Sequence, residues 1–118
     1  MKFLIVEDST TVQAAVYRHL EQAFPKCEVV IANNGKEGFK MLTTHAFDII
    51  ITDLEMAGGD GAGFLGKITN SKVLAKKKIV IFSSKAPPMD LTKTPNIKYV
   101  DKALGATFLI ETIKSLIL

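Results

Sequence analysis

The sequence predicts an α/β domain with a parallel β-sheet between two layers of helices, on three observations. Short apolar runs alternate with segments whose apolar residues recur three and four positions apart, the spacing of an amphipathic helix. The run Phe47–Thr52 carries three consecutive isoleucines, and a strand without polar alternation is buried on both faces. Several runs end in a charged or hydroxyl side chain. Alternating strands and helices favour right-handed crossovers, which place helices on both faces.

The first third of the chain predicts a strand, a helix and a strand. Lys2–Val6 is a short apolar strand. Ser9 or Thr10 can cap the following helix, and Pro25 ends it. Glu28–Ala32 predicts the second strand. The helix between them carries a face with helical spacing, formed by Val12, Ala15, Val16, His19, Leu20 and Ala23.

The middle of the chain repeats this order. Asn33 or Asn34 caps a second helix, which includes Gly38. Phe47–Thr52 is the central strand, and Met56–Gly61 is a loop. Asp60 then caps a third helix, with an apolar face formed by Phe64, Leu65 and Ile68.

The last third predicts two strands and a closing helix. The strands are Ile79–Phe82 and Ile97–Val100, and the amphipathic helix is Ala106–Leu118. Between the strands, Ser84–Asn96 contains three prolines and a thin apolar pattern. Proline is tolerated in the first turn of a helix but not in its interior. We therefore expect a fourth helix that is short or absent.

Composition limits the possible classes of protein. With 118 residues, 47% of them hydrophobic and 23% charged, the chain fits one globular domain spanning residues 1–118. Cys27 is the single cysteine, so it is expected to be a buried filler in a reducing cytoplasm. The net charge of +3 is mild, and the run Lys76–Lys78 lacks interleaved aromatic residues. We expect no nucleic-acid partner.

The opening of the chain does not predict export. Glu7 and Asp8 interrupt the first apolar run well before the length of a secretory signal. No apolar stretch reaches the length that spans a membrane. The expected location is the cytoplasm, without a membrane partner.

Charged and hydroxyl side chains stand where the predicted strands end. Glu7 and Asp8 follow the first strand, Asp53 the third, Ser83 the fourth and Lys102 the fifth. The carboxyl ends of parallel strands meet at one crevice, so these groups should converge. Carboxylates are the ligands that Mg²⁺ prefers, and an ammonium and a hydroxyl suit phosphoryl oxygens. An aspartate is a known nucleophile in phosphoryl transfer.

Four segments, in chain order, resemble the receiver domain of two-component response regulators, in particular the stand-alone regulators of the chemotaxis type. The resemblance covers the whole chain at close to the family's spacing. The segments are Leu4-Ile5-Val6-Glu7-Asp8-Ser9, then Ile51-Thr52-Asp53-Leu54-Glu55-Met56 with Gly59-Asp60-Gly61, then Ile81-Phe82-Ser83-Ser84, and Tyr99-Val100-Asp101-Lys102.

The resemblance implies a single flavodoxin-like, doubly wound sheet of five parallel strands in the order 2-1-3-4-5. It implies that Asp53 accepts a phosphoryl group from a histidine kinase or a histidine phosphotransfer protein. It also implies Mg²⁺ as the cofactor, bound directly by Asp8 and Asp53. Glu7 would bind it mostly through water, and the backbone carbonyl of Glu55 would add a ligand.

The resemblance further implies a switch. Ser83 and Lys102 would contact the phosphoryl oxygens. Tyr99 stands where the family often keeps an aromatic residue that rotates inward as the Ser83 position moves, which is a population shift between two packings. An ordinary half-buried strand aromatic is an equally good interpretation of Tyr99. The output face would bind an unknown downstream protein, and the chain either works alone or is one piece of a longer protein.

Three departures from the family pattern stand out. Ala57 replaces a usual proline and precedes two glycines, so that loop should be more flexible. Ala103 replaces a proline that often follows a cis bond, and a trans bond is expected because a non-proline cis bond costs about 2.5–4 kcal/mol. The stretch from Ser83 to Lys102 is shorter than usual, which reduces the fourth helix.

Three other functions were weighed. A receiver-fold interaction module that no longer switches is favoured by Ala103 and the reduced fourth helix, and opposed by the intact acids, Ser83 and Lys102. A phosphatase with Glu55 as general acid lacks a substrate-enclosing insertion at this length. A nucleotide-binding first turn is disfavoured because Glu7–Thr10 has no glycine and is acidic. We therefore expect no enzyme, apart from catalysis of the protein's own phosphorylation and dephosphorylation.

Overall fold

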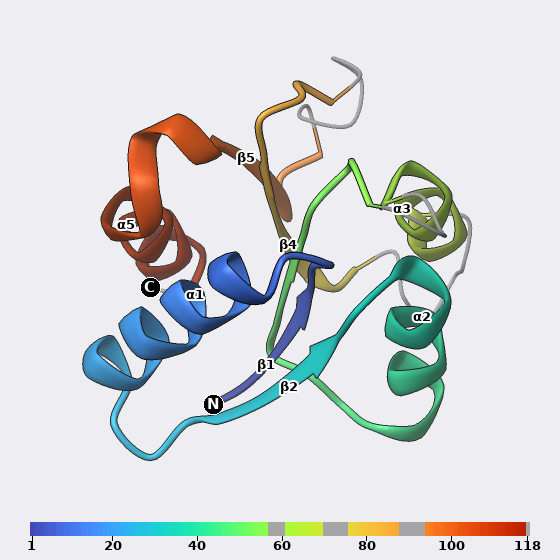
Figure 1. Cartoon of the computed structure of the whole chain (residues 1–118). Coiled ribbons are helices and arrows are strands. Elements are labelled where there is room, and N and C mark those ends of the chain that lie inside the picture. Colours follow the sequence, from blue (N-terminus) through green and yellow to red (C-terminus); the bar gives the residue numbers. More distant parts are fainter. Residues whose placement is uncertain (57–60, 70–75, 88–93, 118) are drawn as a thin grey trace.

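The computed structural model describes residues 1–56, 61–69, 76–87 and 94–117. Five parallel strands form one sheet in the order β2-β1-β3-β4-β5, as expected (Figure 1). This is the flavodoxin-like arrangement, and the carboxyl ends of all strands meet at one edge. The elements are β1 Lys2–Val6, α1 Thr10–Ala23, β2 Glu28–Ala32, α2 Gly35–Thr44, β3 Ile49–Thr52, α3 Gly61–Thr69, β4 Lys78–Ser83, β5 Ile97–Asp101, the 3₁₀ helix η1 Lys102–Leu104, and α5 Gly105–Ile117.

Helices cover both faces of the sheet, with α1 and α5 on one face and α2 and α3 on the other (Figure 1). Successive strand residues point to opposite faces. In β3, Ile50 enters the core under α2 and α3, while Ile49 and Ile51 enter the core under α1 and α5. All three are at most 2% exposed, which confirms the two-sided burial expected for this strand.

Helix α2 lies unusually close to β1 at Gly38. A Cβ atom added there would lie 2.8 Å from Cγ2 of Val6 and 3.0 Å from Cε1 of Phe64. Both distances are below ordinary van der Waals contact, so a methyl group would require these side chains to move. Glycine therefore allows α2 to pack directly behind the end of β1.

The helix caps settle two choices that the sequence left open. The Ser9 side chain accepts a hydrogen bond from the Val12 N–H, and the Asn34 side chain accepts one from the Glu37 N–H. Ser9 and Asn34 are therefore the N-caps of α1 and α2.

Several boundaries differ by one or two residues from those expected. The third strand begins at Ile49 rather than Phe47, where the Asp48 side chain accepts the backbone N–H of Lys2. The fourth strand includes Ser83, and the fifth includes Asp101. The 3₁₀ helix at Lys102 was not predicted; the Asp101 side chain caps it by accepting the Ala103 N–H.

Some of the remaining expectations about the fold concern residues that the structure does not describe. Residues 57–60, where a flexible loop and the Asp60 cap were expected, lie outside the described ranges, as do residues 88–93, where most of the fourth helix was expected. The described peptide bonds are all trans, so the trans bond expected before Ala103 is confirmed. Within the described part of the chain, no helix combines the length and apolar character needed to span a membrane.

Candidate metal and phosphoacceptor site

The register of the central strands brings the acids together. Val6 of β1 pairs with Ala32 of β2 on one side and Thr52 of β3 on the other. The residues that follow Val6 and Thr52, Glu7 and Asp53, therefore emerge side by side. The Glu7 N–H donates to the Ala32 carbonyl (3.0 Å), and the Asp53 N–H donates to the Val6 carbonyl (3.1 Å).

Three carboxylates form one cluster at this edge. Glu7, Asp8 and Asp53 each offer an oxygen that lies within 4.8 Å of the others. Glu7 and Asp53 are buried, at 3% and 4% exposure, whereas Asp8 is exposed. Clustered carboxylates repel one another, and a cation relieves that cost. The cluster predicted from the strand ends is thus present.

Glu7 has a hydrogen-bond partner at every polar atom. Its Oε2 accepts the Ser9 N–H (3.0 Å), its Oε1 lies 2.9 Å from Nζ of Lys102, and its carbonyl accepts from the side chain of Gln13 (2.6 Å). Burial raises the pKa of Glu7 above its usual 4.5, and the contacts with Ser9 and Lys102 offset this only in part.

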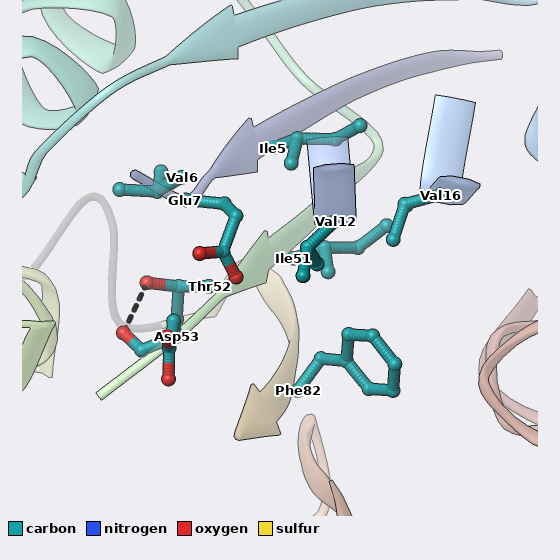
Figure 2. A pocket seen from close by; sticks show the side chains of 9 residues that line it. All are labelled: Ile5, Val6, Glu7, Val12, Val16, Ile51, Thr52, Asp53 and Phe82. Carbon is teal, nitrogen blue, oxygen red and sulfur yellow. Dashed lines mark hydrogen bonds between the residues drawn. The ribbon is translucent and has the colours of Figure 1, made fainter. Parts of the chain in front are cut away.

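The two carboxylate oxygens of Asp53 have different partners. Oδ1 accepts two backbone N–H groups, from Leu54 (2.7 Å) and Glu55 (3.1 Å). Oδ2 lies 2.8 Å from Nζ of Lys102. The Thr52 hydroxyl donates to the Asp53 carbonyl (3.0 Å), which fixes the backbone here (Figure 2). One oxygen is therefore held by the turn after β3, while the other faces the ammonium.

Apolar side chains line the pocket that Glu7 and Asp53 border. Figure 2 shows Glu7 and Asp53 at the ends of adjacent strands, with Val12, Ile51 and Phe82 packed beside them. Apolar surroundings lower the local dielectric and strengthen interactions between charges above what they would be in water. These apolar side chains would therefore strengthen the interaction of the acids with a cation.

Lys102 joins the acids from across the sheet. It begins η1, directly after β5, and its half-buried ammonium lies between Glu7 and Asp53. Burial alone would lower the pKa of Lys102, but the hydrogen bonds to Asp53 and Glu7 outweigh it and the pKa is raised above 10.5. The lysine therefore stays charged at physiological pH.

A hydrogen bond joins Tyr99, in the middle of β5, to Ser83, the last residue of β4. Ser83 is fully buried, and its hydroxyl oxygen accepts the N–H of Lys85 (3.1 Å). The Tyr99 hydroxyl donates to the Ser83 carbonyl (3.2 Å). Burial, helped by the charge of Asp101, raises the pKa of Tyr99 above 10.0. A movement of the Ser83 carbonyl would therefore change the hydrogen bond that Tyr99 makes.

The donor set fits a magnesium ion. Mg²⁺ takes oxygen ligands at about 2.0–2.1 Å, so oxygens on opposite sides of the ion are about 4 Å apart. The three carboxylate oxygens lie within 4.8 Å of one another, close to that span. Glu7, Asp8 and Asp53 could therefore hold such a metal, which would supply positive charge beside a phosphoryl group.

Sequence reasoning missed one buried polar residue, Gln13, and considered Asn33 only as a helix cap. Gln13 is 8% exposed and donates both to the Glu7 carbonyl and to Oδ1 of Asn33 (2.9 Å). A usable signal was present: Gln13 lies three residues before Val16 and seven before Leu20, on the apolar face of α1. A polar residue at such a position needs a hydrogen-bond partner.

Residues 3–114 match the family described as the response regulator receiver domain. The chain belongs to this family. Its members are signalling modules of two-component systems, which interact with histidine kinases and with downstream targets. Among the residues that carry the resemblance, Glu7, Asp8 and Asp53 form one cluster at the carboxyl edge of the sheet, and Lys102 joins them there.

Proteins with related sequences agree with this assignment. A probable transcriptional regulator, ycf29, of Porphyra purpurea is 32% identical over 97% of this chain and 55% of its own length. A probable chemotaxis protein CheY of Rhizobium etli is 26% identical over 99% of this chain and 89% of its own length. The chain spans about half the length of the ycf29 proteins of Porphyra purpurea and Pyropia yezoensis, at 55% and 53%.

Solved structures show the same fold. The response regulator TrrA of Thermotoga maritima, in complex with Mg²⁺ and BeF, is 27% identical and matches with a TM-score of 0.81 over 98% of this chain and 97% of its own. The chemotaxis response regulator CheY4 of Vibrio cholerae is 22% identical, with a TM-score of 0.82 over the same shares of the two chains.

Proposed function

We propose that this receiver accepts a phosphoryl group on Asp53 from a histidine kinase or histidine phosphotransfer protein, with Mg²⁺ bound, and then binds a downstream protein. The observation that carries the proposal is the asymmetric carboxylate of Asp53. Its Oδ1 is held by two backbone N–H groups, and its Oδ2 shares the Lys102 ammonium with Glu7.

In the proposed transfer, Oδ2 of Asp53 forms the new bond to phosphorus. The bond from phosphorus to the donor's histidine nitrogen breaks, and that nitrogen keeps the electron pair. The Lys102 ammonium would exchange its contact with the Asp53 carboxylate for contacts with the equatorial oxygens of the phosphoryl group. Positive charge beside these oxygens stabilises the transition state. Mg²⁺, if held by the acid cluster, would supply further positive charge beside the phosphoryl group. In this role the protein catalyses only its own phosphorylation and dephosphorylation.

The proposed metal ligands are Asp8 and Asp53, with the backbone carbonyl of Glu55 and, through water, Glu7. The acid cluster supports this set because its oxygens have the right chemistry and spacing. The likeness to TrrA, whose structure holds Mg²⁺ and BeF, supports it independently. The N–H of Glu55 bonds to Asp53, so its carbonyl belongs to the turn that borders the cluster.

The proposed switch involves Ser83 and Tyr99. The Ser83 oxygen accepts the Lys85 N–H, so its own hydrogen can be directed to a phosphoryl oxygen. Movement of Ser83 toward the phosphoryl group would alter the carbonyl to which Tyr99 donates. Tyr99 would then change its packing, and the surface around β5 would favour a different partner.

Intact mass after treatment with acetyl phosphate and Mg²⁺ tests the proposal. Wild type should gain the mass of one phosphoryl group, Asp53→Ala should gain none, and Asp48→Ala should behave as wild type. Asp48 is a matched control because it is an exposed aspartate just before β3, at the opposite end of that strand. A label that persists in Asp53→Ala, or no label on wild type, would overturn the proposal.

The alternative is an interaction module with this fold that no longer switches. It is favoured by the position of Lys102, whose single ammonium already pairs with both Glu7 and Asp53. Beryllium fluoride with Mg²⁺ separates the two functions. A switching receiver should show NMR shifts at Ser83 and Tyr99, whereas shifts confined to the acids would favour the module.

A further inference from the structure

We propose that Gln13 is a positioning residue for the magnesium site, because its side-chain amide locks the turn that carries Glu7 and Asp8 to the turn after β2. The proposal rests on the proposed function and adds to it a residue outside the predicted site. Gln13 belongs to α1, beneath the acids, and contributes no charge to them.

The contacts of Gln13 connect two turns of the fold. Its Nε2 has two hydrogens, and two acceptors lie at hydrogen-bond distance: the Glu7 carbonyl at 2.6 Å and Oδ1 of Asn33 at 2.9 Å. The side chain is 8% exposed, so water competes little for these bonds. An amide donor here is therefore specific, since neither a hydrocarbon nor a carboxylate could replace it.

The bond to the Glu7 carbonyl controls the direction of Asp8. That carbonyl belongs to the peptide group between Glu7 and Asp8, so holding it fixes the plane from which Asp8 departs. Glu7 itself is already held by Ser9, Ala32 and Lys102. Asp8 is the exposed member of the cluster, and its side chain leaves the backbone directly after this peptide group.

The bond to Asn33 anchors Gln13 to a rigid part of the fold. Asn33 directly follows β2, and the side chains of Asn33 and Asn34 both donate to Glu37 of α2, at 3.5 and 3.1 Å. Asn34 in turn accepts the Glu37 N–H at 2.8 Å. The hydrogen bonds thus run from the metal site to the capped first turn of α2.

This arrangement opposes the repulsion within the acid cluster. Three neighbouring carboxylates tend to separate when no divalent ion lies between them. The exposed Asp8 could relieve that repulsion by rotating its peptide group outward, and Gln13 makes this motion cost a buried hydrogen bond. The metal then binds a preformed site rather than ordering one, which increases its affinity.

The test compares Gln13→Met with Gln22→Met by calorimetric titration of Mg²⁺. Methionine keeps the length and volume of glutamine but cannot donate. Gln22 lies on the same helix and is exposed, so it is the matched control. Gln13→Met should bind Mg²⁺ about tenfold more weakly, the lower end of losses seen when outer partners of metal ligands are removed. Gln22→Met should keep the wild-type affinity.

Two further readouts separate positioning from general damage. The rate of phosphorylation of Gln13→Met should return to within about twofold of wild type at saturating Mg²⁺, because the site is weakened and not destroyed. In metal-free protein, the NMR signal of the Asp8 amide should broaden in Gln13→Met and stay sharp in Gln22→Met. Rate loss that saturating Mg²⁺ does not rescue would overturn the proposal.

Asn33→Ala keeps the test decisive even if Gln13→Met does not fold. Its side chain is exposed, so its removal leaves the core intact. It should weaken Mg²⁺ binding in the same direction but less, and the two changes should be non-additive because they act through one network. If Gln13→Met binds Mg²⁺ with wild-type affinity, the role of Gln13 is refuted but the proposed function is not. If Gln13→Met does not fold, wild-type affinity in Asn33→Ala has the same meaning. Wild type that binds no Mg²⁺ refutes the proposed function as well.

Discussion

The two sides of the site are built differently. On the β1–β3 side, Glu7 and Asp53 are held mainly by backbone groups, and each acid has partners in its own turn. On the β4–β5 side, the hydroxyls of Ser83 and Tyr99 each make one hydrogen bond to a backbone group, and the Lys102 ammonium bridges Glu7 and Asp53. Two backbone donors on one carboxylate oxygen fix its position, whereas a single hydroxyl bond, or the ion pairs of a long lysine side chain, can be exchanged for others when a ligand arrives. The β1–β3 side is therefore suited to holding a ligand in place, and the β4–β5 side is suited to rearranging when a ligand binds.

Lys102→Met should give the largest effect and tests the second side most directly. Loss of a charge that stabilises the transition state typically costs about 10²–10³ in rate, and phosphorylation of Asp53 should slow by that much. Affinity for Mg²⁺ should stay the same or rise, because the ammonium no longer competes for Glu7 and Asp53.

The Lys102 measurement combines labelling by acetyl phosphate with a Mg²⁺ titration. Lys98→Met is the control, since Lys98 is an exposed lysine on β5, the strand that precedes Lys102. A fall in Mg²⁺ affinity equal to the fall in rate would show that the two sides are one unit, against the comparison above.

Ser83→Ala should come next. A neutral hydroxyl donor is weaker than a charged one, so we expect a fall of about tenfold in phosphorylation rate, with unchanged Mg²⁺ affinity. Ser83→Thr should restore most of the rate. Ser84→Ala is the control, because Ser84 is the exposed neighbour of the buried Ser83. Equal behaviour of the two serine variants would remove Ser83 from the site.

Tyr99→Phe should have a smaller effect, on stability. The change removes the hydrogen bond to the Ser83 carbonyl and should lower the free energy of unfolding by about 1 kcal/mol. Labelling of Asp53 should continue at nearly the wild-type rate, since the Tyr99 hydroxyl donates to the Ser83 carbonyl rather than to the acids. Urea denaturation of Tyr99→Phe measures this loss of stability, and Tyr17→Phe is the control because Tyr17 is exposed. A slowed labelling rate would place Tyr99 with the side that holds the ligand instead.

The smallest expected effect is a pH dependence from Glu7. Its pKa is raised by burial, so the folded protein binds that proton more readily than the unfolded chain. Stability contributed by Glu7 is therefore present below about pH 4.5 and decreases as pH rises through the folded-state value. In EDTA, wild type should lose stability relative to Glu7→Gln between pH 4 and pH 7, as urea midpoints would report. A difference in stability between the two proteins that does not change with pH would contradict the raised pKa of Glu7.

Much of the site could be predicted because strand ends are visible in the sequence. The apolar runs before Glu7 and Asp53 are continuous, and the topology of a parallel sheet then brings their ends together. Lys102 was also found this way, although its residence in a 3₁₀ helix was not, since the Asp101 cap that starts it is a local side-chain contact. The choice between Ser9 and Thr10 as cap likewise required coordinates, because both are good cap residues.

The contacts that cross between elements were not predictable. Gln13 reaches Asn33 only because β1 and β2 pair in a register that places their following turns together. The sequence marked Gln13 as a polar residue on an apolar face, but it did not identify the acceptors. Gly38 similarly looked like an ordinary interruption of a helix, and its close approach to Val6 depends on how α2 lies on the sheet.

The tight packing at Gly38 offers a purely steric control over a charged centre. A single added methyl group would press on Val6, and Val6 is bonded through its peptide to Glu7. An engineer who wished to retune the sensitivity of this module without altering its ionic groups would therefore begin behind the sheet, with the volume of one side chain.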